Sequence, residues 1–271
     1  MKADLHIHSN ISDSTLTGEE IIHQAVVHGI GVLSITNHDT AKCQDEFARE
    51  AMQQGLSYIK GIEISAYDNS EKVSVHILGY GYDNDRLLND YCSIINERRA
   101  EAGIKMAEQI IKMGYDISID DIMQYSESGI IYRPHILHAL FERGHVKGIV
   151  NEQFEEWFAK DGPAYSPFEY ANPYESIELV KEAGGLAVLA HPAYYKNWAC
   201  IPSLVAAGLD GIEVYHPDHS NEEKAALLAI ADGYKLFTTS GSDFHGMYAR
   251  NPVPIGHGCE PVSVAILAKI G

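Results

Sequence analysis

The sequence predicts an α/β fold in which a mostly parallel sheet, closed or nearly closed, is covered by helices. Short β-like runs alternate with helical patterns along most of the chain, as in strands joined by crossover helices. The length of 271 residues is normal for a single α/β barrel. One long helical stretch interrupts the alternation, so we expect one unit with a helical insertion.

The first third of the chain predicts four strands and two helices. Strands are expected over 3–7, 32–36, 58–66 and 73–80, and the last two flank a turn at 68–72, since apolar runs bounded by polar turn residues read as strands. Helices are expected over 17–29 and 41–55. The first would start at Thr17 and stop at Gly29, residue types typical of the two helix ends.

The rest of the chain divides into a helical part and a second alternating part. Residues 86–114 read as one amphipathic helix, followed by helices over 134–144 and 151–162 with no strand between them. Strands are then expected over 186–190, 211–215 and 236–240, with helices over 173–185, 201–208 and 220–233. We therefore predict a barrel from 1–85 and 166–271, with a helical insertion subdomain at 86–165.

Composition limits the possible partners and the location. The chain has 20 Lys and Arg against 38 Asp and Glu, a formal net charge of −18. Because nucleic-acid backbones are bound by Lys and Arg, we expect no duplex nucleic acid as partner. No apolar run has membrane-spanning length, and the N-terminus lacks a signal-peptide core. The four scattered cysteines read as reduced thiols, so the prediction is a cytoplasmic protein that binds no membrane.

Nine metal-ligand residue types are expected to gather at one face of the sheet. They lie at predicted strand ends or in the first loop, and strand ends of a barrel converge on its active face. They are His6, His8, Asp13, His38, Glu63, His76, His191, Asp243 and His245. Nine ligands imply two or three divalent metals, and mixed imidazole and carboxylate ligation suits Mn, Fe or Zn. Adjacent divalent cations suit phosphoryl chemistry.

Several separated motifs resemble those of the PHP family (polymerase and histidinol phosphatase domains), a group of metal-dependent phosphoesterases. The motifs are DLHIHSNISD, ITNHDT, GIEIS, HILGY, AHP and GSDFH, in this order from residue 3 to about 257. The resemblance implies a distorted (β/α)7 barrel. It also implies one metal site of His6, His8, Glu63 and Asp243, a second that shares Glu63 and adds His76 and His191, and a third of Asp13, His38 and His245.

Two positions depart from the family pattern. Asn37 stands where the family commonly has aspartate, and Ser14 stands where it has glycine. We expect Asp4, Asn37 and Asp39 to support the metal ligands from behind, because metal-bound imidazoles are usually oriented by such neighbours.

Three further residues are candidates for contacting the substrate. Arg133 and His135 begin a predicted helix in YRPHILHAL, where a guanidinium and free backbone N–H groups can hold a phosphate. The tripeptide RPH in this segment resembles the phosphate contact of PHP members with a helical insert. His216 follows the strand GIEVY and could bind phosphate or protonate a leaving group. Asp13 and His216 are the candidate catalytic residues, and the role of His219 is left open.

The leading hypothesis is a phosphoesterase in which a metal-bound hydroxide attacks a small phosphorylated substrate in line. The resemblance implies a nucleoside 3′,5′-bisphosphate or a cyclic ribose phosphate as substrate, and the residues do not choose between them. Alternatives are 5′-to-3′ trimming of short RNA, a histidinol phosphatase, and a non-catalytic metal-binding module. Protein partners are not predicted.

Overall fold

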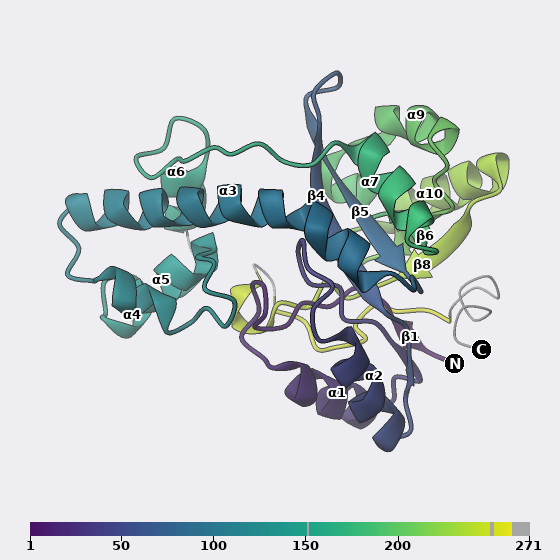
Figure 1. Cartoon of the computed structure of the whole chain (residues 1–271), viewed down its shortest axis with the longest axis horizontal. Helices are drawn as coiled ribbons and strands as arrows, with labels where there is room; N and C mark the ends of the chain where they lie inside the picture. Colours follow the sequence, from purple (N-terminus) through teal and green to yellow (C-terminus); the bar gives the residue numbers. More distant parts are fainter. Residues whose placement is uncertain (151, 250–251, 262–271) are drawn as a thin grey trace.

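The structure, a computed structural model, describes residues 1–150, 152–249 and 252–261. It is a mixed α/β fold, as expected, and its strands form two sheets (Figure 1). The three-stranded sheet is parallel and contains β1 (Ala3–Asp4), β2 (Val32–Leu33) and β3 (Ser57–Tyr58). The five-stranded sheet runs in the order β4 (Gly61–Asp68), β5 (Val73–Tyr80), β6 (Leu186–Leu189), β7 (Gly211–Tyr215) and β8 (Phe237–Ser240).

The described strands do not form the closed barrel that the sequence suggested. Within the described residues, isolated bridges connect the two sheets, Ile7 to Phe244 on one side and His38 to Glu63 on the other. Beyond Asp4, the backbone still contacts the chain around β8, with Leu5 N–H donating to Ser240 O at 3.0 Å and Asp243 N–H to His6 O at 2.9 Å.

The five-stranded sheet is mixed, not mostly parallel. β4 and β5 pair antiparallel because only a four-residue turn joins them, and β5 also runs antiparallel to β6, whereas β6–β7 and β7–β8 are parallel. The reversal of β5 matters for the site. His76 lies in the first half of its strand, not at its end, and the antiparallel register places it opposite Ser65 of β4.

Helices cover the sheets on separate sides in Figure 1. α1 (Gly18–Val27) and α2 (Gln44–Gln53) lie together beside the small sheet, and α7 (Pro173–Glu182), α9 (Ile201–Ala206) and α10 (Asn221–Tyr234) lie beside the large one. α1 starts as predicted, with the Thr17 hydroxyl and the Glu20 carboxylate capping each other's backbone N–H groups. Two short helices were not foreseen, α4 (Ile119–Met123) and α8 (Pro192–Tyr195).

The described part of 86–165 contains helices and no strand, as predicted. α3 (Asp85–Lys112) leads to α4, α5 (Arg133–Glu142) and α6 (Glu152–Phe158) at the far end of the molecule (Figure 1). α3 belongs to two apolar cores. Leu88, Cys92 and Ile95 pack in the cluster under the large sheet, whereas Met106, Ala107 and Ile110 pack with α5 in a separate cluster.

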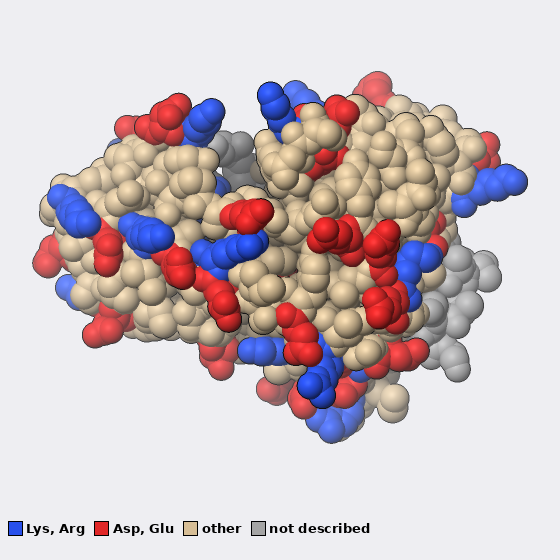
Figure 2. All heavy atoms as spheres, turned by 45° about the horizontal axis from the view of Figure 1, so that its top comes forward, with Lys and Arg blue, Asp and Glu red and all other residues tan. Residues whose placement is uncertain are grey.

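The surface carries charges of both signs. Acidic side chains stand beside Lys and Arg over the face in Figure 2, within a net charge of −18. No described helix is both long and apolar enough to span a membrane. The four cysteines are free thiols, as expected. The exclusion of duplex nucleic acid and the cytoplasmic location stay predictions.

Candidate metal centre

Glu63 lies at the centre of the nine residues that the sequence singled out. It is the third residue of β4 and is 1% exposed. Its Oε2 lies 3.3 Å from His6 Nε2, 3.1 Å from His8 Nε2 and 3.1 Å from His38 Nδ1. Its Oε1 lies 2.8 Å from His76 Nδ1 and 3.0 Å from His191 Nε2. One buried carboxylate therefore meets five imidazoles from four separate segments, since His6 and His8 belong to the same one.

Asp243 closes the same cluster from the chain after β8. Its Oδ1 lies 3.2 Å from His6 Nε2, 3.3 Å from His8 Nε2 and 3.5 Å from His245 Nδ1. The two ends of the chain thus meet at one point, as the motifs DLHIH and DFH suggested. Asp243 has a φ of +49° and His191 a φ of +26°, an uncommon backbone region for residues other than glycine that is often found at functional sites.

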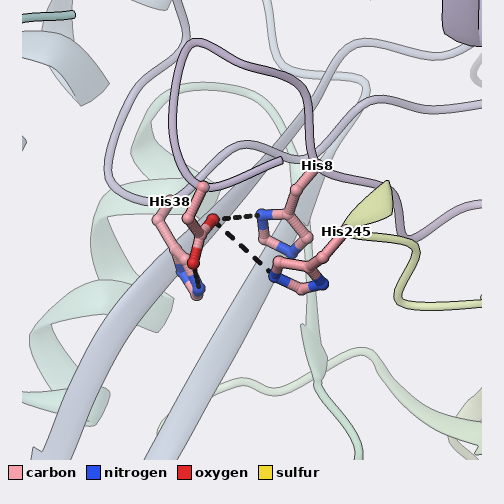
Figure 3. Close-up of side chains that lie close together, drawn as sticks. His8, His38 and His245 are labelled. Atoms are coloured by element: carbon pink, nitrogen blue, oxygen red, sulfur yellow. Dashed lines mark ion pairs between the residues drawn. The ribbon is translucent and has the colours of Figure 1, made fainter. Parts of the chain in front are cut away.

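Asp13 lies among a second group of imidazoles. Figure 3 shows His8, His38 and His245 around one carboxylate, with dashed ion pairs running to it. Asp13 Oδ1 lies 3.5 Å from His8 Nδ1 and 3.6 Å from His245 Nε2, and Oδ2 lies 3.8 Å from His38 Nε2. The side chains of Asp13, His38 and His245 are 12–17% exposed, so this group lies nearer the open cavity than Glu63 does.

The described residues contain four groups whose ligand atoms all lie within 4.8 Å of one another. The groups are His8, Asp13, His38 and His245; His6, His8 and Asp243; His6, Glu63 and His191; and His38, Glu63 and His76. All nine expected residues occur in these groups. The structure therefore brings the predicted set together, with Glu63 in two groups as a shared carboxylate would be.

Crowding of carboxylates and imidazoles shifts their pKa values strongly. Burial disfavours charge on His8, but Asp243, Glu63 and Asp13 outweigh it and raise the pKa of His8 to about 9. Burial likewise opposes ionisation of Glu63, but neighbouring His38 and His6 hold its pKa well below the ordinary value. The pKa of Asp243 is also held well below the ordinary value, against burial, chiefly by His6 and His245.

Buried nitrogen and oxygen atoms of the cluster lack the hydrogen bonds that such atoms normally make. His6 Nε2, His8 Nε2, Asp13 Oδ1 and Asp243 Oδ1 are all buried without a hydrogen-bond partner. Nearly all buried polar atoms are hydrogen-bonded in folded proteins, so these four atoms need another partner. Divalent cations of the first transition row fit this mixed nitrogen and oxygen donor set.

The predicted supporting residues hold loops in place. Asn37 Oδ1 accepts hydrogen bonds from Ser9 N–H at 2.7 Å and Ser12 Oγ at 3.0 Å, which fixes the loop leading to Asp13. Asp39 Oδ1 accepts from Ser65 N–H at 2.8 Å. Asp4 accepts from the backbone N–H groups of Ser242 at 2.9 Å and Gly256 at 2.6 Å, so it anchors the backbone next to Asp243 and does not contact an imidazole ring.

Glu213 is a supporting residue that the sequence reasoning missed. It is fully buried in β7, and its oxygens lie 3.2 and 3.3 Å from His6 Nδ1. Its Oε2 also accepts from His191 N–H at 2.8 Å. A carboxylate on the free ring nitrogen orients a ligating imidazole. The sequence does contain a sign of this role, because Glu213 is an acidic residue within the apolar strand GIEVY, as Glu63 is within GIEIS.

A cavity of about 630 Å³ opens over the cluster, a size typical of small-molecule sites. Arg133 lines it, is half-buried, and forms no ion pair with the described residues. His216 also lines it and is 2% exposed. His135 is buried but is not part of the lining; its Nδ1 accepts from Tyr132 N–H at 3.3 Å and caps α5. His219 is held by Val214 O, 2.9 Å from its Nδ1.

A family model described as the PHP domain matches residues 4–178. A relative from Eggerthella lenta, phosphoribosyl 1,2-cyclic phosphate 1,2-diphosphodiesterase, is 33% identical over 93% of this chain and 97% of its own. The 3′,5′-nucleoside bisphosphate phosphatase of Chromobacterium violaceum is 31% identical over 98% of this chain and 97% of its own. The 5′-3′ exoribonuclease Rnm of Escherichia coli is 31% identical over 89% and 84%.

A solved structure agrees with these relatives. A protein from Bifidobacterium adolescentis, named as a metal-dependent phosphoesterase, superposes with a TM-score of 0.88 at 30% identity, covering 99% of this chain and 94% of its own. The agreement extends over the helical part as well as the sheets.

Proposed function

This chain belongs to the PHP family of metal-dependent phosphoesterases, and from that premise we propose that it hydrolyses a phosphate ester of a small phosphorylated ribose compound. Its general activity is that of a phosphoric ester hydrolase. The observation that carries the narrower proposal is the cavity of about 630 Å³, which has the nine-residue cluster and Arg133 in its lining or directly beneath it. That volume suits one small phosphorylated molecule.

We propose that two or three divalent ions, Mn, Fe or Zn, are held by the nine residues. His6, His8, Glu63 and Asp243 would hold one ion, Glu63 with His76 and His191 a second, and Asp13, His38 and His245 a third. When bound, such ions polarise phosphate oxygens, activate water and neutralise a leaving oxygen. The shared position of Glu63 and the orphaned donor atoms support this assignment.

The proposed role of His216 is to donate a hydrogen bond to a phosphate or leaving-group oxygen. Asp218 N–H donates to His216 Nδ1 at 3.1 Å, so Nε2 carries the ring hydrogen. That Nε2 is buried without a hydrogen-bond partner and lies 3.5 Å from Asp243 Oδ2. Burial disfavours the charged ring, but Asp243 and Glu213 outweigh it, so the pKa of His216 lies above its ordinary value.

The proposed role of Asp13 is catalytic as well as ligating, since it faces the cavity among three imidazoles. His8, His38 and His245 hold its pKa below the ordinary value despite burial, so it stays ionised. A fixed, ionised carboxylate at this position can orient water beside the phosphate.

Arg133 is the proposed phosphate clamp, and its replacement should weaken substrate binding. Arg133→Ala removes charge-assisted hydrogen bonds worth about 1.5–3 kcal/mol, which corresponds to about a 10- to 100-fold rise in KM with little change in kcat. Steady-state kinetics with a nucleoside 3′,5′-bisphosphate measures both. Arg143→Ala is the matched control, because Arg143 follows α5, is 50% exposed and pairs with Asp121. An unchanged KM for Arg133→Ala would leave Arg133 as a surface residue.

A substrate panel tests the proposed function. The Mn²⁺-loaded protein is assayed for phosphate release and ring opening with AMP, a nucleoside 3′,5′-bisphosphate, a ribose cyclic phosphate and a short 5′-phosphorylated RNA. We expect fastest turnover of one of the two small ribose compounds. Turnover of RNA alone would favour the exoribonuclease alternative, which the Escherichia coli relative supports. No turnover of any substrate with metals bound would contradict the proposal.

We further propose that the two sheets are halves of a distorted (β/α)7 barrel, formed by 1–85 and 166–271, with 86–165 as the inserted subdomain. The bridges on both sides of the sheets support the first part, and the separate apolar cluster around α5 supports the second.

A further inference from the structure

Arg99 is a buried arginine that the sequence reasoning did not single out. It belongs to α3, lines the cavity, and its side chain is 11% exposed. Its Nη2 donates to Asp39 Oδ2 and, at 2.9 Å, to Ser65 Oγ. A buried charge is costly unless it is paired and hydrogen-bonded, so this residue is held in one position by specific partners.

Two aromatic rings also hold the Arg99 guanidinium. Its Cζ lies 5.0 Å from the ring centroid of Tyr132 and 5.0 Å from that of Phe168, within the range of cation–π attraction. Tyr132 is the residue before Arg133 and precedes the first turn of α5. One side chain therefore contacts the segment after β2, strand β4, the start of α5, and the segment that returns to α7.

Two other residues of α3 hold the same segment after β2. Asn96 Nδ2 donates to Asp39 O at 2.8 Å, and Asn89 Oδ1 accepts from Ala41 N–H at 2.9 Å. Spacings of seven and three residues place Asn89, Asn96 and Arg99 on one face of the helix. This face of α3 thus fixes the residues that immediately follow His38.

Ser65 links Arg99 to His38. The Ser65 Oγ that accepts from Arg99 also lies 3.2 Å from His38 Nδ1. His38 Nε2 faces Asp13, so the ring presents one nitrogen to the Asp13 group and the other toward Ser65 and Glu63. Ligating imidazoles depend on such a contact at the second nitrogen for their orientation.

We propose that Arg99 is a positioning residue. It fixes the position of His38 in the candidate metal centre relative to that of Arg133 on the substrate side of the cavity. Through Ser65 and Asp39 it fixes the His38 ring and the backbone beside it. Through Tyr132 it fixes the start of α5. The proposal rests on the proposed phosphoesterase function and adds to it a residue from the helical part of the chain.

Arg99 is a weaker candidate for a direct phosphate contact than Arg133. The Arg99 guanidinium is already paired with the Asp39 carboxylate, whereas Arg133 forms no ion pair with the described residues and lines the same cavity. A direct contact would also give a different kinetic signature, because loss of a phosphate contact raises KM and leaves metal binding unchanged.

The test compares Arg99→Met with Arg98→Met. Arg98 is the next residue of α3, is 41% exposed and pairs with Glu169 at 2.9 Å on the surface, so its replacement should leave metal content and kinetics unchanged. For Arg99→Met we expect a fall in kcat of about 10- to 100-fold, as for loss of a residue behind a metal ligand. We also expect fewer metal ions per chain by mass spectrometry. Arg99→Lys should recover only part of the loss, since an ammonium cannot reproduce the planar fork.

Two results would overturn the proposal. One is wild-type metal content and kcat in Arg99→Met, and the other is a rise in KM alone, which would make Arg99 a substrate contact. If Arg99→Met does not fold, as judged by circular dichroism, Ser65→Ala removes only the link to His38 and should lower metal content and kcat; wild-type values there would also overturn it. An inactive wild type that binds metals would refute the proposed function instead, while metal counts would still test Arg99.

Discussion

Replacing Glu63 with glutamine should lower phosphoesterase activity by about 10³-fold and remove most of the bound metal. Glu63 contacts five imidazoles, and glutamine keeps the shape but loses the charge that these groups surround. A loss of about 4 kcal/mol of transition-state stabilisation corresponds to about a 10³-fold fall in kcat. Metal content by mass spectrometry and phosphate release measure the two effects on the same preparation.

Glu71→Gln is the matched control for Glu63→Gln. Glu71 is exposed in the turn between β4 and β5, so the same chemical change on the surface should leave both readings at wild-type values. A Glu63→Gln variant that kept its metals and its turnover would exclude Glu63 as the shared ligand.

The second large effect is expected for Asp243→Asn. Asp243 Oδ1 approaches His6, His8 and His245, and its Oδ2 approaches His216, so the substitution disturbs the metal centre and the proposed hydrogen-bond donor together. We expect a fall in kcat of about 10²- to 10³-fold, corresponding to about 2.7–4 kcal/mol. The metal content should fall by about one ion per chain, because the cluster has other carboxylates.

The readings for Asp243→Asn are kcat and metals per chain, with Asp232→Asn as control on the exposed face of α10. Turnover and metal content equal to the wild type would remove Asp243 from the ligand set.

The candidate ligands could be singled out from the sequence because most lie in or directly after short apolar strand motifs, where polar side chains are unexpected. His6, His8 and Glu63 interrupt apolar runs. A buried charge or imidazole is costly unless neighbouring groups compensate it. The positions of the candidate ligands at predicted strand ends then implied that they share one face. All nine residues lie together in the structure, which agrees with that expectation.

The supporting residues were harder to predict because their partners are distant in sequence. Glu213 reaches His6 across 207 positions, and Arg99 reaches Asp39 and Ser65 from a helix assigned to another part of the fold. For His135, a local motif suggested a role that its surroundings in the structure do not support. Its motif suggested a phosphate contact, but its ring is turned to the α5 backbone by a local hydrogen bond, so that role stays a prediction.

The large sheet is mixed, not mostly parallel as the alternation of strands and helices suggested. The short turn 69–72 makes β4 and β5 a hairpin, and this reversal brings His76 to the cluster from the first half of its strand. The expected strands 3–7 and 32–36 are two residues long in the structure, Ala3–Asp4 and Val32–Leu33.

The most direct test of the metal centre is the metal content of the wild-type protein. The chain is purified without chelators from cells supplied with Mn²⁺, and Mn, Fe and Zn per chain are counted by mass spectrometry. We expect two to three divalent ions per folded chain. Fewer than one ion per chain, in a protein whose circular dichroism shows the mixed α/β fold, would contradict this expectation.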